Sequence, residues 1–174
     1  MEEYCAIWKL NINVSKTKVT VFSRGNIRKI PTFYFGDKKL DVVDHYKYLG
    51  LHFNFNGKFT VAQKQLYEKG NRAMFSLLRK SRQLQLPVDI QLNLFDVLVN
   101  SVLLYGCEVW AHEGTDILEK LHLRYCKYIL LVNKTTCSNM VYGELGITPL
   151  LLHAQCSRVG VDCNRNRNRN RIFS

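Results

Sequence analysis

The chain has 174 residues, of which 47% are hydrophobic, so it can bury a core as one ordinary domain or as two small pieces. Its formal charge is +11, and the excess lies in residues 1–90, which hold 16 Lys and Arg against 7 Asp and Glu, whereas residues 91–174 hold 9 against 7. This balance favours a polyanionic partner such as nucleic acid, with a merely solubilising surface as the alternative, and no apolar run approaches the roughly 20 residues of a membrane span.

The first third of the chain is predicted to form short strands joined by tight turns. Tyr4, Ile7 and Trp8 have helical spacing, and residues 19–22 then alternate as a strand does. A hairpin is predicted over residues 33–42, with its turn near Gly36-Asp37. Residues 46–55, YKYLGLHFNF, are predicted to be the next strand, in which Gly50 marks a bulge or the close approach of another backbone.

Residues 60–84 carry the strongest helical pattern. At 100° per residue, one set of apolar residues falls within about 60°, and a set of basic residues lies on nearly the opposite side. The apolar set is Ala62, Leu66, Ala73, Leu77 and Leu84, and the basic set is Lys64, Arg72, Arg79 and Arg82. The basic set predicts contact with a phosphate backbone, and a solvated surface is the alternative.

Further helices are predicted after Pro87. Residues 91–105 are apolar nearly all round, which predicts a central buried helix that ends or kinks at Gly106. A helix capped by Thr115 or Asp116 follows, and residues 138–144 form a short last helix with Gly146 as its C-cap and Pro149 as its stop. The core face of the middle helix is Leu118, Leu121, Tyr125, Ile129 and Val132.

The predicted fold class is α+β. A small antiparallel sheet with a hairpin (about residues 19–55) precedes an antiparallel helical bundle (about residues 60–145). Residues 153–174 form a basic tail with a four-fold Asn-Arg repeat at residues 164–171, which predicts disorder.

Six cysteines are present, and none forms a C-x-x-C pair. Because no secretory signal opens the chain, reduced thiols and a cytoplasmic or nuclear location are expected. The set Cys137, His153, Cys156 and Cys163 matches no standard zinc spacing, so no metal site is predicted.

The residues alone predict a basic binding protein without a complete active site. Two-metal phosphoryl transfer needs neighbouring carboxylates, and the only adjacent acidic pair is Glu2-Glu3. No P-loop, nucleophile elbow or H-E-x-x-H motif is present. The histidines show no ligand spacing, and His122 is predicted to lie on a helix surface.

Four blocks nevertheless resemble the reverse transcriptases of non-LTR (LINE-type) retrotransposons. Residues 8–22 are similar to the W-x-L-x-I-N-x-x-K-T segment of palm motif D. Residues 46–50, YKYLG, resemble motif E, the primer grip, which implies a hairpin over residues 46–55. Residues 103–110, LLYGCEVW, and residues 140–150 resemble blocks of the helical thumb. The four blocks stand in the family's order and cover roughly residues 4–152.

The resemblance implies roles for particular positions. Lys16 matches the motif D lysine that assists proton transfer to pyrophosphate, and Lys18 is the weaker candidate. Tyr48, Leu49 and Gly50 would hold the primer terminus, and Lys64, Arg72, Arg79 and Arg82 would face the template–primer duplex. A surface lysine beside a strand is the alternative for Lys16.

The departures from the family bear on activity. The family binds Mg²⁺ through an Asp-Asp pair that would precede Met1, so no cofactor is expected in this fragment and it should not polymerise alone. The implied organisation is residual palm (residues 1–58), thumb-like region (59–152) and tail (153–174). The implied partners are an RNA/DNA template–primer duplex and the upstream polymerase portion. The alternatives are a stand-alone nucleic-acid-binding module and a truncated relic without function.

Overall fold

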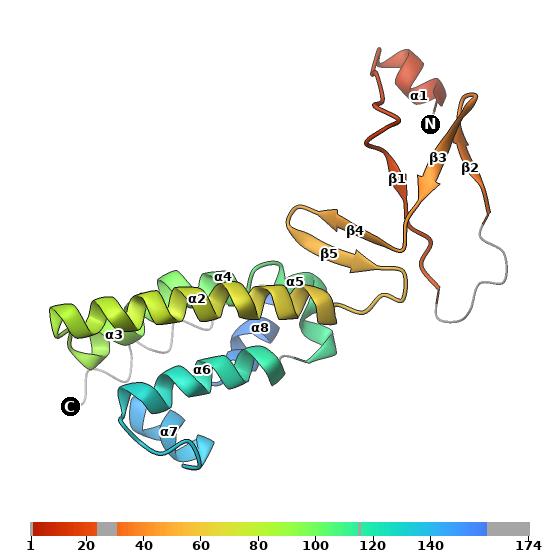
Figure 1. The fold of residues 1–174 in the computed structure, drawn as a ribbon. Helices are drawn as coiled ribbons and strands as arrows, with labels where there is room; N and C mark the ends of the chain where they lie inside the picture. The colour runs from red at the N-terminus through yellow and green to blue at the C-terminus, as the bar shows by residue number, and fades with distance from the viewer. Residues whose placement is uncertain (1, 24–30, 115, 160–174) are drawn as a thin grey trace. The chain divides into compact units, whose positions relative to one another are not determined.

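The computed structural model describes residues 2–23, 31–114 and 116–159, and it divides the chain between Ala62 and Gln63. We call residues 1–62 the sheet unit and residues 63–174 the helical unit (Figure 1). The mixed α+β class predicted from the sequence is confirmed: after the short helix α1, the strands precede the other helices along the chain. The predicted tail beyond residue 159 lies outside the described residues.

The sheet unit begins with a short helix and a three-stranded sheet of order β1-β3-β2. β2 and β3 are antiparallel, and Phe35 pairs with Lys38 across the predicted Gly36-Asp37 turn, where Gly36 has a φ of +57°. β1 runs parallel to β3, so this sheet is mixed rather than purely antiparallel. The elements are α1 (Glu2–Ile7), β1 (Lys18–Val19), β2 (Phe33–Phe35) and β3 (Lys38–Val42).

Residues 46–55 form a second hairpin, as the resemblance to the primer grip implied, and not the single strand that the residue pattern predicted. β4 (His45–Tyr48) and β5 (Leu51–Asn54) are antiparallel, with Tyr48 paired to Leu51. Leu49 and Gly50 form the two-residue turn, with φ values of +46° and +88°. Positive φ at both central positions is the requirement of a type I′ turn, so the interpretation of Gly50 as a bulge is wrong.

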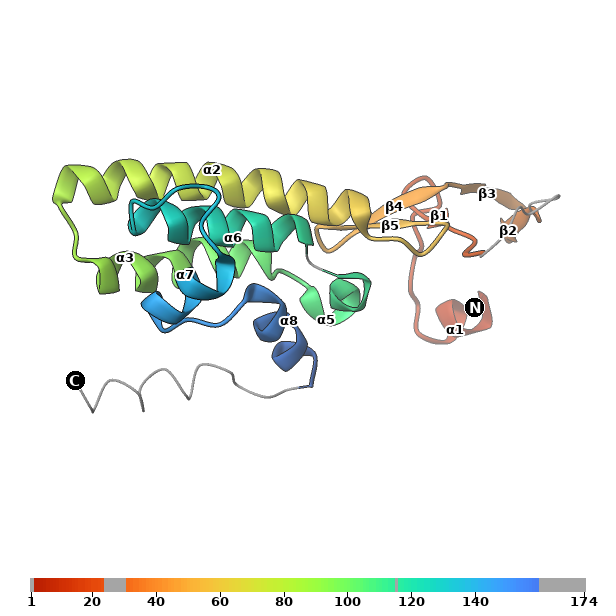
Figure 2. The ribbon, with the colours of Figure 1, turned by 90° about the horizontal axis from the view of Figure 1, so that it is seen from below.

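The helical unit contains a long helix followed by shorter ones (Figures 1 and 2). The long helix begins at Thr60 and ends at Leu84, as predicted. The elements are α2 (Thr60–Leu84), α3 (Val88–Phe95), the π-helical turn η1 (Asp96–Asn100), α4 (Ser101–Leu103), α5 (Cys107–Trp110), the 3₁₀ turn η2 (Ala111–Glu113), α6 (Asp116–Ile129), α7 (Ser138–Leu145) and α8 (Leu150–Val159).

α2 buries the face that its sequence predicts. Leu66, Met74 and Leu77 are at most 5% exposed, and Gly70 lets the helix approach Leu103 of α4 closely. Leu84 departs from the prediction, because the last residue of the helix is 66% exposed. The long helix is therefore fixed along one side by apolar packing.

The predicted central helix is a continuous run of α3, η1 and α4. Phe95, Val99 and Leu103 are fully buried, whereas Val97 and Leu98 are at least half exposed, so the helix is not buried all round. It ends before Gly106, which adopts a φ of +65° as the predicted break requires.

The last helices differ from the prediction in one respect. α7 ends at Gly146 as expected, and a pair of hydrogen bonds forms a Schellman motif, from Gly146 N to Gly143 O (3.2 Å) and from Ile147 N to Tyr142 O (3.1 Å). α8 was not predicted. It begins directly after Pro149, runs past residue 152, and packs against α5 and α6 (Figure 2).

The cysteines follow the prediction only in part. Cys5, Cys107, Cys126 and Cys137 carry free thiols, and the first three are buried. Cys156 of α8 is disulfide-bonded, so the expectation of reduced thiols throughout is wrong at this position.

Candidate nucleic-acid interface

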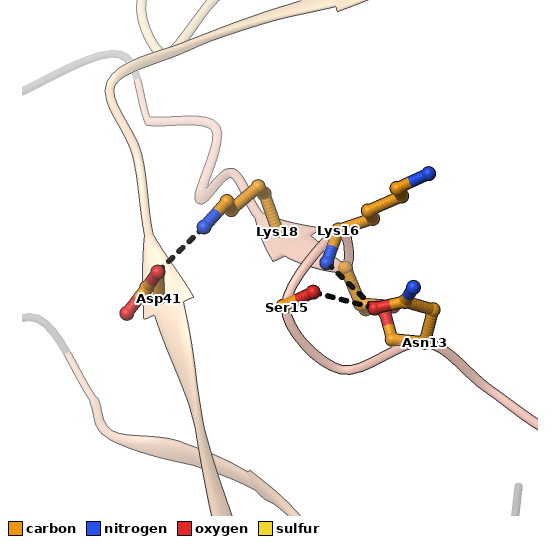
Figure 3. Close-up of polar contacts among 6 residues, drawn as sticks. Asn13, Ser15, Lys16, Lys18 and Asp41 are labelled. Atoms are coloured by element: carbon orange, nitrogen blue, oxygen red, sulfur yellow. Dashed lines mark hydrogen bonds and ion pairs between the residues drawn. The ribbon is translucent and has the colours of Figure 1, made fainter.

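The loop before β1 holds Lys16 in a fixed turn (Figure 3). The side-chain oxygen of Asn13 accepts hydrogen bonds from Ser15 Oγ (2.6 Å) and Lys16 N (3.3 Å). The backbone carbonyl of Asn13 accepts one from Thr17 Oγ1 (2.9 Å). An Asn side chain that bonds its own backbone in this way stabilises a turn. The Lys16 side chain is exposed and points away from the neighbouring Lys18–Asp41 pair.

Lys18 has a different environment from Lys16. Its Nζ lies 2.5 Å from Asp41 Oδ2, because the two residues pair across the parallel strands β1 and β3. The hydrogen bond and the charge of Lys18 lower the pKa of the Asp41 carboxyl below its usual value. Within the described residues, Lys18 forms an ion pair and Lys16 does not.

A surface cavity of about 320 Å³ lies between the β1 strand and the second hairpin. We call it the aromatic cavity; its lining is Lys18, Thr20, Phe22, Tyr46, Tyr48 and Phe53. The backbone bonds from Val43 N to Val19 O and from Ser23 N to Phe55 O bring the two segments together. Exposed aromatic rings beside a cation are the usual means of stacking unpaired bases.

The structure relates the predicted primer-grip residues to this cavity in part. Tyr48 lines it and is 58% exposed, whereas Leu49 and Gly50 form the exposed tip of the hairpin outside the lining. Lys16 is also outside the lining. Phe22 and Tyr46 were missed from the sequence, although the alternation Lys18, Thr20, Phe22 was a signal that they share one face of a strand.

The four basic residues predicted on α2 are all exposed. We call Lys64, Arg72, Arg79 and Arg82 the basic face of α2. Arg72 Nε donates to Glu68 O (3.3 Å), and Arg82 Cζ lies 4.9 Å from the ring centre of Tyr128 on α6. All four lie in the helical unit, whereas Lys16 and the aromatic cavity lie in the sheet unit.

The described residues offer no grouped carboxylates like those of a polymerase Mg²⁺ site. Within the described residues, no group of three or more His, Cys, Asp or Glu side chains is placed to hold a metal ion. Asp41 forms an ion pair with Lys18, which lines the aromatic cavity. No catalytic step through a metal can be derived from these residues.

A buried polar cluster joins α6, α7 and α8, and it corrects the prediction that His122 lies on a helix surface. His122 is 2% exposed and stacks on Phe95, with ring centres 5.5 Å apart. Glu119 accepts hydrogen bonds from Tyr142 Oη and from Leu151 N (3.1 Å). The signal was present in the sequence, because His122 follows the core position Leu121 and lies inside the apolar arc of α6.

Burial controls the protonation of this cluster. Loss of hydration, with a smaller contribution from His153, lowers the pKa of His122 to about 4. Glu119 Oε1 lies 4.0 Å from His122 Nδ1, but both Glu119 oxygens already accept other hydrogen bonds. Burial likewise raises the pKa of the Cys126 thiol to about 12, so this thiol is not a nucleophile at neutral pH. The cluster is structural.

Among the described residues, no helix has both the length and the apolar character to cross a membrane. Comparison with known protein families, curated proteins and solved structures gave no match.

Proposed function

We propose that this chain is the palm-and-thumb part of a non-LTR retrotransposon reverse transcriptase, and that it holds a template–primer duplex. The observation that carries the proposal is the basic face of α2, four exposed cations on one side of a single 25-residue helix. Lys64 and Arg82 are 18 residues apart, about 27 Å along the helix axis. That length is about eight base pairs of B-form duplex, so the four cations can meet phosphates of both strands along one side of the duplex.

The sheet unit supports the same proposal. The motif E resemblance falls on a tight hairpin with an exposed tip, and Tyr48 lines a cavity of aromatic rings with Lys18. A primer terminus offers an unpaired or frayed base and a phosphate, for which aromatic faces and a lysine are suited partners. We assign primer contact to Tyr48, Leu49 and Gly50, and assistance at the departing pyrophosphate to Lys16.

The proposed chain does not polymerise by itself. Nucleotide transfer needs carboxylates that hold two metal ions, and the described residues contain no such group of carboxylates. The upstream polymerase portion would supply those carboxylates. It would also cover apolar side chains that the sheet unit leaves exposed on and after α1, such as Ile7 and Trp8, which are 74% and 64% exposed.

A stand-alone nucleic-acid-binding module is the second candidate. It is favoured by the core of the helical unit, in which Trp110, Tyr125 and Phe95 are fully buried without help from another chain. This candidate keeps the basic face of α2 as the binding surface but assigns no role to the hairpin. A relic without function predicts no binding at all.

The test is binding of a fluorescein-labelled 16-base-pair RNA–DNA duplex, followed by fluorescence anisotropy at low salt. Arg72→Ala/Arg79→Ala should weaken binding about tenfold or more, because two phosphate contacts are lost. The matched control is Lys69→Ala/Lys80→Ala, which removes two exposed cations from other positions on α2 and should change affinity less than threefold. Equal losses in both variants would contradict the assignment of the basic face.

Two further measurements separate the candidates. Tyr48→Ala should weaken binding of a recessed primer terminus more than binding of a blunt duplex if the hairpin grips the primer. An equal effect on both favours the stand-alone module. Primer extension with Mg²⁺ should give no product, and any template-dependent product contradicts the proposal that the chain lacks its own active site.

A further inference from the structure

A second surface cavity, of about 500 Å³, lies on the outer side of α6 and the loop that follows it. Lys127 Nζ donates to Lys134 O (2.7 Å), which ties the loop to the helix and fixes one wall. We call it the α6 cavity. It is lined by Lys120, Leu123, Arg124, Lys127, Tyr128, Val132 and Lys134.

The α6 cavity gathers most of the basic residues of the second half of the chain that lie outside the Asn-Arg run. Residues 91–174 contain nine Lys and Arg, of which four belong to the Asn-Arg run and one is Arg158. The other four all line this cavity, and no Asp or Glu lines it. Within the described part of the chain, none of these four forms an ion pair.

These cations repel one another. Lys120, Arg124 and Lys127 follow at spacings of four and three residues on one helix, where like charges destabilise the helix. An anionic ligand relieves this repulsion. The charge therefore identifies the ligand as one that carries more than one negative group.

The floor of the cavity is apolar, formed by Leu123, Val132 and the ring of Tyr128. A bare phosphate gains nothing from contact with apolar side chains, whereas a nucleobase can stack on them. Its volume is of the order of a single nucleotide, which is too small for a duplex.

The α6 cavity lies beside the basic face of α2. Arg82 of that face covers the ring of Tyr128, and Arg124 lies 5.2 Å from the ring centre of Phe75 on α2. A single nucleic-acid strand that continues from a duplex bound on α2 can therefore reach the neighbouring α6 cavity.

We infer that the α6 cavity binds one unpaired nucleotide of a single strand continuous with the duplex, with the base on Leu123, Tyr128 and Val132 and the flanking phosphates on the four cations. The position of this strand beside a duplex rests on the proposed function. The cavity gives the chain a preference for a junction of duplex and single strand over a blunt duplex.

The test compares three labelled probes by fluorescence anisotropy: a blunt 16-base-pair RNA–DNA duplex, and two versions of it that carry a four-nucleotide RNA overhang at one end or at the other. The natural chain should bind one of the overhanging probes at least about fivefold more tightly than the blunt probe. Lys120→Gln/Lys134→Gln should reduce that gain to less than twofold while blunt-duplex affinity changes little.

Two further variants test whether the gain depends on the α6 cavity itself. Val132→Asp, which places a carboxylate on the floor of the cavity, should abolish the gain as well. Lys69→Gln/Lys80→Gln, with the same loss of charge on α2, should keep it. Thermal melts followed by circular dichroism confirm that each variant is folded.

The outcomes are distinct. Equal affinity for all probes, or a gain that survives Lys120→Gln/Lys134→Gln and Val132→Asp, overturns the α6 assignment. A gain that is lost equally in the Lys69→Gln/Lys80→Gln control also overturns it, because charge alone then explains the binding. If instead Arg72→Ala/Arg79→Ala leaves blunt-duplex binding intact while the gain behaves as expected, the proposed function fails and the cavity assignment stands.

Discussion

The two units of the chain differ in the burial of their aromatic side chains: among the described residues, those that are fully buried all lie in the helical unit. In the helical unit Trp110 and Phe95 are at most 1% exposed, whereas in the sheet unit Trp8 and Phe22 are 64% and 59% exposed. Burial of such side chains is the main source of folding free energy. The helical unit can therefore hold its own structure, and the sheet unit keeps apolar surface for a partner or ligand.

The largest expected effect is a difference in stability between alanine variants of the two tryptophans. Trp110 is fully buried and its Nε1 donates to Tyr105 O (3.0 Å), so Trp110→Ala should lower the free energy of unfolding by about 3–5 kcal/mol. Trp8→Ala should change it by less than about 0.5 kcal/mol. Urea denaturation followed by circular dichroism measures both. Similar losses for the two variants would show that the units do not differ as described.

A pH dependence should follow from the buried cluster of the helical unit. The unfolded chain protonates His122 near pH 6.5, while the folded chain does so only near pH 4, so the unfolded state binds more protons between these values. The free energy of unfolding should therefore fall as the pH drops from 6.5 to 4, by up to about 3 kcal/mol. His153, whose pKa is also lowered by burial, acts in the same direction.

His122→Phe keeps an aromatic ring on Phe95 and removes the proton site, so urea denaturation of this variant should show a flatter profile over that pH range. Glu119 and Tyr142 also face His122, and their shared hydrogen bond is unchanged by the substitution. A profile as steep as that of the natural chain would place the titrating group elsewhere.

A smaller effect distinguishes two helical glycines of the helical unit. A Cβ at Gly70 would come within 2.3 Å of Leu103 Cδ2, and Leu103 is fully buried and cannot move aside freely. Gly70→Ala should lower the free energy of unfolding by about 1–2 kcal/mol despite its better helix propensity. Gly143 of α7 has nothing within 4 Å, so Gly143→Ala should raise it by about 0.5–1 kcal/mol. Thermal melts of the two variants should shift in opposite directions.

An effect of similar size is expected in the sheet unit. Leu49 has a φ of +46°, which L-residues with large side chains disfavour. Leu49→Asn should relieve this strain by roughly 1 kcal/mol and slow amide hydrogen exchange in β4 and β5. Faster exchange in the variant would mean that the Leu49 side chain, not the turn, stabilises the hairpin.

Local patterns predicted the parts of the fold that depend on neighbouring residues. The period of 3.6 residues gave α2 its bounds, and Gly36, Gly106 and Gly146 marked a turn and two helix ends. The residue pattern alone did not divide residues 46–55 into two strands, because Gly50 was interpreted as an interruption within one strand and Leu49 is a poor signal for a turn that needs positive φ. The resemblance to the primer grip was what implied a hairpin there.

Contacts between distant residues were beyond the sequence. The burial of His122 depends on α7 and α8 closing over α6, and α8 was not foreseen because residues from 153 onward lack a clear apolar period. The α6 cavity was missed for a related reason, since counting charge over half of the chain averaged its four cations against scattered acidic residues. The basic face of α2 could be predicted because it lies on one helix.

The most direct test of the central claim is the salt dependence of binding to the blunt RNA–DNA duplex. If the basic face of α2 meets the phosphate backbone, a plot of log affinity against log salt should be steep for the natural chain. Arg72→Ala/Arg79→Ala should reduce its slope by about two units, one for each lost phosphate contact. An unchanged slope in this variant would contradict the claim that α2 holds the duplex.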